Sequence, residues 1–132
     1  MQVKEKNRRE MEERLKGMGD YVKMDYLLSA LKQQKDFDTK RFALVKLSEL
    51  YEQRKMFLDA GKMMQNAAPL NPSDKSKIAD YLRAGELLMK AANFDDADRA
   101  FEKAIAYGNT QEKWQIKQKR IDLYKAQAEE YM

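Results

Sequence analysis

Hydrophobic side chains recur at steps of three and four residues through most of this chain, a period typical of helices that bury one face. In the segment at about 20–35 these positions are Tyr21, Met24, Leu27, Leu28 and Leu31. The same period predicts further helices at about 39–54, 57–68, 74–92, 95–107 and 110–131. No segment alternates as a strand does. We therefore predict an all-α fold of about six to seven helices, packed as antiparallel hairpins.

The first segment is different, because residues 3–16 favour a helix but carry few hydrophobic side chains. Its apolar seam consists only of Val3, Met11, Leu15 and Met18. Such a helix is marginal alone in water, so we expect it to dock loosely, to pair with another chain or to fray. Gly17 and Gly19 end it, and Asp20 can cap the next helix. We therefore separate a charged, mobile N-terminal helix at 1–18 from a single helical domain at 19–132.

The breaks between the helices are short and carry turn and capping residues. In "PLNPSD", Pro69 and Pro72 cannot continue a helix, and Ser73 or Asp74 can cap the next one. The same reasoning makes Asp38 or Thr39 the candidate caps in "KDFDTK". Near the C-terminus, Gly108 ends one predicted helix and Thr110 begins the last.

An internal similarity appears when the chain is shifted by 37 residues. The aligned pairs are Phe57–Phe94, Ala60–Ala97, Met64–Phe101, Ala67–Ala104, Tyr51–Leu88, Ser48–Gly85 and Leu44–Tyr81. Small residues at Gly85, Ala97 and Ala104 allow two helices to approach closely, and Phe101 fills the remaining space. These positions are expected to be structural, and a bulky residue at Gly85 is expected to destabilise the fold.

The pattern resembles the tetratricopeptide repeat, a helical hairpin marked by bulky and small residues at fixed spacing. The second unit supplies Tyr81, Gly85, Ala97, Phe101 and Ala104, and the first supplies Leu44, Ser48, Tyr51, Ala60, Ala67, Leu70 and Pro72. The resemblance covers about 41–124, with Trp114 opening a third, unpaired first helix, and it fits 20–40 less well. A looser likeness is to the helical repeats of vesicle-fusion adaptors. The resemblance implies a short right-handed solenoid of stacked hairpins.

The resemblance also implies a function, because the family holds partner peptides or helices on the concave face of the solenoid. The lining residues would be Phe42, Val45, Glu49, Glu52, Leu82, Glu86 and Met89, with Gln115, Lys119 and Asp122 added by the last helix. An apolar strip with glutamates suits an amphipathic, basic helix and would repel acidic chaperone tails. The alternative is that these residues form a solvated outer face, or that the N-terminal helix covers them.

The amino-acid composition excludes several classes of function. The 132 residues include 26 basic and 22 acidic side chains, and the chain has neither cysteine nor histidine. Disulfides, thiolate nucleophiles and imidazole bases are therefore excluded. The carboxylates of "DFDTK" and "NFDDAD" lie at helix starts, where capping explains them. We therefore predict a protein that is not an enzyme and uses no cofactor or metal.

Nucleic-acid binding is the alternative function. Lys113, Lys117 and Arg120 lie close to Trp114, and an aromatic side chain among basic ones can bind single strands. We instead expect Trp114 to pack on the preceding hairpin, because Trp114, Ile121 and Tyr124 share one helix face. Self-association through exposed ends is a further possibility. The N-terminus shows no signal peptide and no segment is long and apolar enough to span a bilayer, so a cytoplasmic location is expected.

Overall fold

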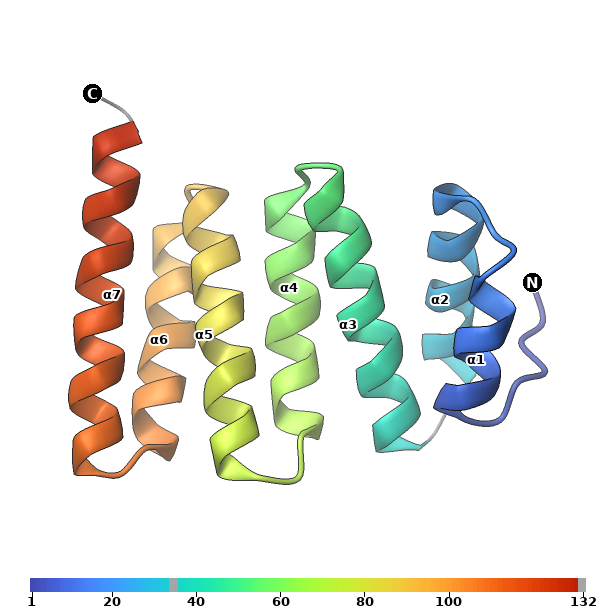
Figure 1. Ribbon diagram of the computed structural model, residues 1–132, viewed down its shortest axis with the longest axis horizontal. Coiled ribbons are helices and arrows are strands. Elements are labelled where there is room, and N and C mark those ends of the chain that lie inside the picture. Colours follow the sequence, from blue (N-terminus) through green and yellow to red (C-terminus); the bar gives the residue numbers. More distant parts are fainter. Residues whose placement is uncertain (34–35, 131–132) are drawn as a thin grey trace.

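Seven α-helices and one short 3-10 helix make up the computed structural model, which describes residues 1–33 and 36–130 of the chain. They are α1 (Arg8–Leu15), α2 (Asp20–Gln33), α3 (Phe37–Gln53), α4 (Phe57–Ala67), η1 (Ala68–Leu70), α5 (Asp74–Lys90), α6 (Phe94–Tyr107) and α7 (Thr110–Glu130). Successive helices from α2 to α7 run antiparallel and stand side by side in a row (Figure 1). No strand occurs in the described residues. The prediction of an all-α fold is confirmed.

The observed bounds agree with the predicted ones within a few residues, except at the N-terminus. Residues 3–7 were predicted as helical but are not: α1 begins at Arg8, because the side chain of Asn7 caps it by accepting from the Glu10 N–H at 2.9 Å. Residues 34 and 35, expected in the second helix, and residue 131, expected in the last, lie outside the described residues.

Polar side chains cap most of the helix starts. Ser73 accepts from the Ser76 N–H at 3.1 Å, which confirms it as the cap of α5. The prediction for α3 was wrong: its cap is Asp36, which accepts from both the N–H and the hydroxyl of Thr39, at 2.9 and 2.7 Å. Thr39 itself lies in the first turn of α3, since the helix begins at Phe37, directly after Asp36.

The two turns that follow α3 and α5 have the same backbone geometry, 37 residues apart. Lys55 and Ala92 both take up φ near 61°. The next N–H in each turn bonds five residues back, from Met56 to Tyr51 at 2.8 Å and from Asn93 to Leu88 at 2.9 Å. This is the Schellman arrangement, which normally places glycine at the left-handed position. The helices are offset alike: α3 and α5 begin at residues 37 and 74 and end at 53 and 90.

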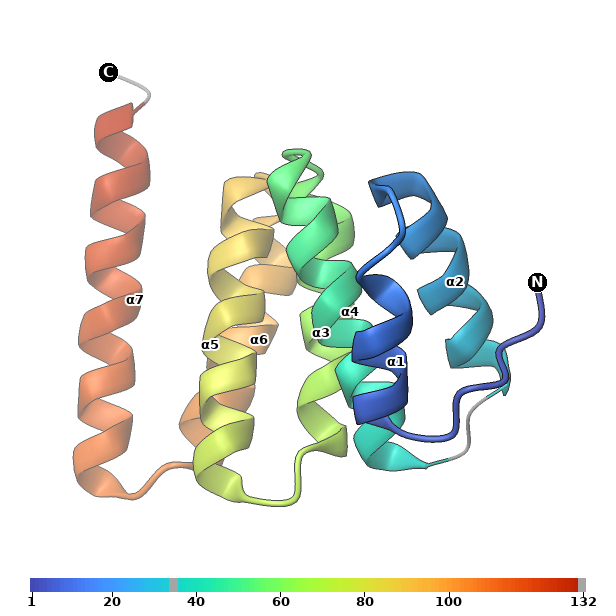
Figure 2. The same cartoon turned by 45° about the vertical axis from the view of Figure 1, so that its right-hand side comes forward.

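Buried hydrophobic side chains of the described residues form three clusters along the row of helices. Met11 and Leu15 of α1 are buried with side chains of α2 and α3, so α1 docks on its own chain (Figure 2). Farther along, the ring of Phe101 in α6 is fully buried against Gly85 of α5. A Cβ at Gly85 would lie 2.7 Å from that ring, so the glycine is required by close helix packing.

A buried polar network joins the start of α3 to α5. Asp80 accepts two hydrogen bonds from the guanidinium of Arg41, at 3.0 and 2.9 Å. The side-chain amide of Asn71, just after η1, donates to the same carboxylate at 3.0 Å. The Asp80 side chain is 9% exposed and that of Arg41 is 29% exposed. The network thus fixes the proline-containing connection against the two helices that flank it.

The last helix is held against α5 and α6 by side-chain hydrogen bonds along its length. Arg120 donates to Glu102 at 2.9 Å, and the Tyr124 hydroxyl donates to Asp98 at 2.5 Å. Near the end of the helix, the Gln127 amide donates to the Met89 carbonyl at 2.6 Å. These contacts decide which side of α7 faces the row.

The Tyr124 contact predicts a dependence of stability on pH. Burial, followed by the hydrogen bond to Asp98, raises the pKa of Tyr124 from its ordinary value of 10.0 to about 12. The folded state therefore holds this proton more tightly than the unfolded state. The resulting stabilisation is complete below pH 10 and is lost as the pH rises through the folded pKa of about 12. We expect the stability gap between the native chain and Tyr124→Phe to narrow over that range, as measured by urea unfolding.

Tyr124→Phe serves as the reference because it keeps the ring and removes only the titrating hydroxyl. Other tyrosines titrate in both proteins, so their contributions cancel in the difference. A gap that stays constant from below pH 10 to near pH 12 would contradict the assigned hydrogen bond.

Candidate partner-binding face

The residues predicted to line a partner site come from two helices with matching positions. Val45 and Leu82 are half-buried at equivalent places of α3 and α5, 37 residues apart. The same offset relates Glu49 to Glu86 and Glu52 to Met89. The two helices thus share one apolar and one acidic position, whereas Glu52 corresponds to the apolar Met89.

Two of the predicted lining residues are core residues in the structure. Phe42 is buried with Met11 and Leu15 of α1, and the guanidinium of Arg8 lies 5.4 Å from the centre of its ring. Met89 is buried in the cluster around Phe101, because α7 extends far enough to cover it. In this arrangement neither side chain offers a surface to a partner. The N-terminal helix therefore covers part of the predicted face, as the alternative interpretation had it.

The glutamates of this face are matched by cations of the same chain. Arg83 of α5 forms ion pairs with both Glu52 and Glu86, the latter at 3.2 Å. Burial lowers the pKa of Arg83, but hydrogen bonds and charges from the two glutamates more than offset this and raise the pKa overall. On α3, Lys46 lies 3.5 Å from Glu49. The excess of negative charge that would select a basic partner is therefore largely compensated within the chain.

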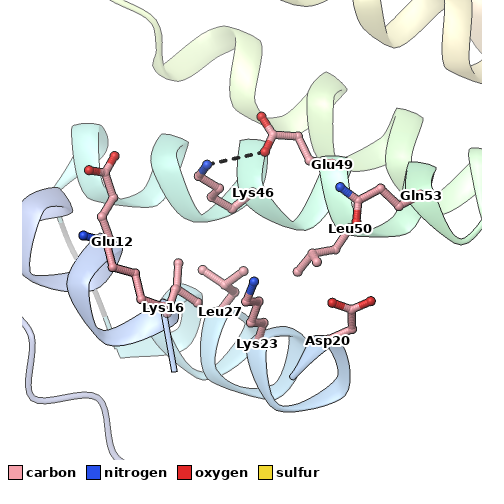
Figure 3. Close-up of a pocket in the computed structure, with 10 residues that line it drawn as sticks. Glu12, Lys16, Asp20, Lys23, Leu27, Lys46, Glu49, Leu50 and Gln53 are labelled. Carbon is pink, nitrogen blue, oxygen red and sulfur yellow. Dashed lines mark ion pairs between the residues drawn. The ribbon is translucent and has the colours of Figure 1, made fainter. Parts of the chain in front are cut away.

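A pocket of about 420 Å³ lies where α1, α2 and α3 meet, beside Glu49 (Figure 3). Leu27 and Leu50 point toward it from α2 and α3. Leu15 of α1 also lines it. The pocket lies just past the end of α1 at Leu15, and residues from all three helices line it.

Charged side chains surround these three leucines. Most of them have a partner of opposite charge: Glu12 pairs with Arg8, Lys16 with Glu13, Asp20 with Arg54 and Lys46 with Glu49. Lys23 has no ion pair among the described residues and is half-buried at the rim. The site can therefore enclose an apolar side chain while a polar or acidic group beside it meets Lys23.

The sequence did not indicate this pocket. Leu15 and Leu27 fit a helix core equally well, and the structure buries both of them. Sequence reasoning also missed Gly61 of α4, where a Cβ would lie 2.7 Å from the side chain of Leu88. The glycine in "DAGKMM", inside a helical pattern, was the available signal for a close helix contact.

The residues of the nucleic-acid alternative all lie on α7. Lys113, Trp114 and Lys117 are exposed, whereas Arg120 is held by Glu102 of α6. The expectation that Trp114 packs on the preceding hairpin is wrong, since it is 64% exposed. The buried side of α7 carries Ile116 and Gln127 instead. Gln115, Lys119 and Asp122 are exposed as well.

Among the described residues, no group of three or more carboxylates is placed to hold a metal ion. Within the same residues, no helix is both long and apolar enough to cross a bilayer. No protein-family model matches this chain, and neither a curated protein nor a solved structure does.

Proposed function

We propose that this protein is a non-catalytic scaffold that binds a helix or an extended peptide of a partner protein on the face formed by α3 and α5. The observation that carries the proposal is the 37-residue correspondence of these two helices, which includes their ends, their turns and the positions Val45–Leu82 and Glu49–Glu86. A face built from corresponding side chains suits a ligand that lies across several helices.

The same register extends to α2, where the sequence predicted a poor fit. Leu27, Met64 and Phe101 follow one another at 37-residue steps on α2, α4 and α6, and all are buried. Ala30, Ala67 and Ala104 are also spaced by 37 residues on these three helices, and none of them has any exposed area. These positions support a helical repeat of the tetratricopeptide kind, and a short right-handed solenoid is part of our proposal.

The pocket beside Glu49 indicates which kind of partner side chain this face can bind. Its floor of Leu15, Leu27 and Leu50 favours an apolar side chain, whereas Lys46 and Arg83 compensate the glutamates around the face. We therefore place the main contribution to affinity on an apolar side chain in the pocket, and expect the glutamates to set orientation.

Affinity capture from cell lysate tests the proposal. A protein bound by the native chain, with nuclease present, should be retained about tenfold less by Glu49→Lys/Glu86→Lys, because the new lysines repel basic groups and add to Lys46 and Arg83. Glu129→Lys/Glu130→Lys is the matched control, since both glutamates are exposed near the end of α7 and the charge change is the same.

Circular dichroism of the variants should first show an unchanged helix content. Equal capture by the double variant and the native chain would contradict binding at this face. Loss of capture on nuclease treatment would favour the nucleic-acid alternative instead.

A further inference from the structure

The last helix carries the whole excess of positive charge of this protein. The chain has 26 basic and 22 acidic side chains, a formal net charge of +4. Residues 113–125, all within α7, hold one acidic side chain, Asp122, and five basic ones, which are Lys113, Lys117, Lys119, Arg120 and Lys125. The rest of the chain holds 21 side chains of each sign and is neutral. A partner attracted by charge is therefore anionic and is drawn to α7.

The four lysines of this segment can all reach an anion. Each of them is exposed, and none forms an ion pair among the described residues. Two carboxylates of α6 that contact α7 are already engaged, since Asp98 accepts from Tyr124 and Glu102 accepts from Arg120. The positive charge of the lysines is therefore not compensated by these neighbours.

Trp114 lies among these lysines with its ring open to solvent. It directly follows Lys113 and precedes Lys117 by about one turn, and it is 64% exposed. Ile121, two turns farther along the same line, is 44% exposed. The buried Ile116 lies about 160° around the helix from Trp114, so this line faces away from the row that α7 ends (Figure 1). Lys113, Trp114, Lys117, Ile121 and Lys125 are called the outer face of α7.

The pattern of the outer face favours nucleic acid among the possible anions. An open aromatic ring between cations can stack on a base while the lysines contact the phosphates on either side. A bilayer surface fits less well, because Lys117 and Lys125 interrupt the apolar line and leave no continuous apolar face to enter the headgroups. An acidic peptide would match the lysines but would leave the open indole ring without a role.

We propose that the outer face of α7 binds single-stranded nucleic acid, with one base stacked on Trp114 and neighbouring phosphates bound by Lys113, Lys117 and Lys125. Trp114 and Lys125 are separated by a rise of about 16 Å along the helix, so the site spans a few nucleotides. Stacking and charge attraction accept any base, so binding is independent of sequence and weakens as salt rises. The site shares no residue with the face formed by α3 and α5, so its test is independent of the proposed function.

Intrinsic fluorescence tests the proposal directly, because Trp114 is the only tryptophan of the chain. An oligothymidylate of about 15 nucleotides, at about 50 mM salt, should quench this emission with a dissociation constant of about 10⁻⁴ M or lower. The logarithm of the affinity should fall with the logarithm of the salt concentration with a slope of about −2, as three phosphate contacts predict. A DNA duplex of the same length should quench little, because its bases are stacked within the duplex.

The contribution of charge is measured with a labelled oligothymidylate by fluorescence anisotropy. Lys113→Ala/Lys117→Ala should weaken binding about tenfold, because two of the phosphate contacts are lost. Lys62→Ala/Lys75→Ala is the matched control. These lysines of α4 and α5 are also exposed and without an ion pair in the described part of the chain, so this variant should bind like the native chain.

The contribution of stacking is measured in the same way. Trp114→Ala should weaken binding at least about fivefold, the lower end of the range for a stacked base. Phe37→Ala is the matched control, because Phe37 is an equally exposed aromatic residue at the start of α3 and its variant should bind like the native chain. Circular dichroism should show the same helix content for all variants.

The proposal is overturned by unchanged Trp114 emission at about 1 mM oligonucleotide. It is also overturned if both lysine pairs weaken binding equally or if Trp114→Ala binds like the native chain. Binding of polyglutamate as tight as that of the oligonucleotide would assign the outer face to an acidic protein instead. A blue shift of Trp114 emission with phosphatidylserine vesicles, without any effect of the oligonucleotide, would assign it to a membrane surface.

Discussion

Replacing Arg41 by methionine is expected to lower the free energy of unfolding by roughly 3–5 kcal/mol, because it removes the cation from a buried carboxylate. Asp80 would keep only the hydrogen bond from Asn71, at 3.0 Å, in a side chain that is 9% exposed. Methionine preserves much of the volume of arginine, so lost packing contributes little. This loss is a large part of the ~5–15 kcal/mol by which most domains are stable.

Urea unfolding followed by circular dichroism measures this effect, with a constant m-value as evidence that only stability has changed. Arg99→Met is the matched control. Arg99 forms an ion pair with Asp96, but its side chain is 68% exposed, so its removal should cost at most about 1 kcal/mol.

Asp80→Asn separates charge from packing. In Arg41→Met/Asp80→Asn no buried charge remains and the amide can still accept from Asn71, so the double variant should be more stable than Arg41→Met alone. If the double variant instead loses as much stability as Arg41→Met and Asp80→Asn lose together, the ion pair does not account for the cost of removing Arg41.

Phe101→Ala is expected to cost roughly 3–5 kcal/mol, the usual range for removing a fully buried aromatic ring. Phe101 has no exposed area and packs between Gly85 of α5 and Tyr124 of α7, whose ring centre lies 6.3 Å away. The cavity would therefore open at the contact of three helices. Phe37→Ala is the matched control, because Phe37 is 64% exposed and its loss should change stability by less than about 0.5 kcal/mol.

Gly85→Ala tests the same contact from the opposite side. The new methyl group would lie 2.7 Å from the Phe101 ring, and overpacking of this kind costs about 1–3 kcal/mol. In Gly85→Ala/Phe101→Leu the ring is absent. The double variant should therefore lose about 1 kcal/mol less stability than the two single variants lose together. Strict additivity in thermal and urea unfolding would show that the glycine and the ring are not in contact.

Among the features of this protein, the positions of the helices follow from the sequence itself. The three- and four-residue periodicity located six of the seven α-helices in the described residues, and Ser73, Gly108 and Thr110 marked ends that the structure confirms. These are local properties, since a cap or a break acts within one turn of the backbone. The start of α1 and the cap of α3 were misplaced because several nearby polar residues could serve.

The side of each helix that faces the core depended on the tertiary structure. In α7, Trp114 and Ile121 form one apolar stripe, and Ile116 with Leu123 forms another. The sequence favoured the first stripe, but packing against α5 and α6 buries the second. A helix with two apolar stripes gives no local signal that distinguishes them.

The electrostatics and shape of the partner face also required the tertiary structure. Arg83 meets Glu52 across 31 positions of sequence, and Arg41 meets Asp80 across 39. The pocket combines side chains of α1, α2 and α3 that are far apart in the sequence. The sequence determined which segments are helical, because that depends on near neighbours. The charge balance and the open surfaces depend on how those helices pack, and only the tertiary structure decided them.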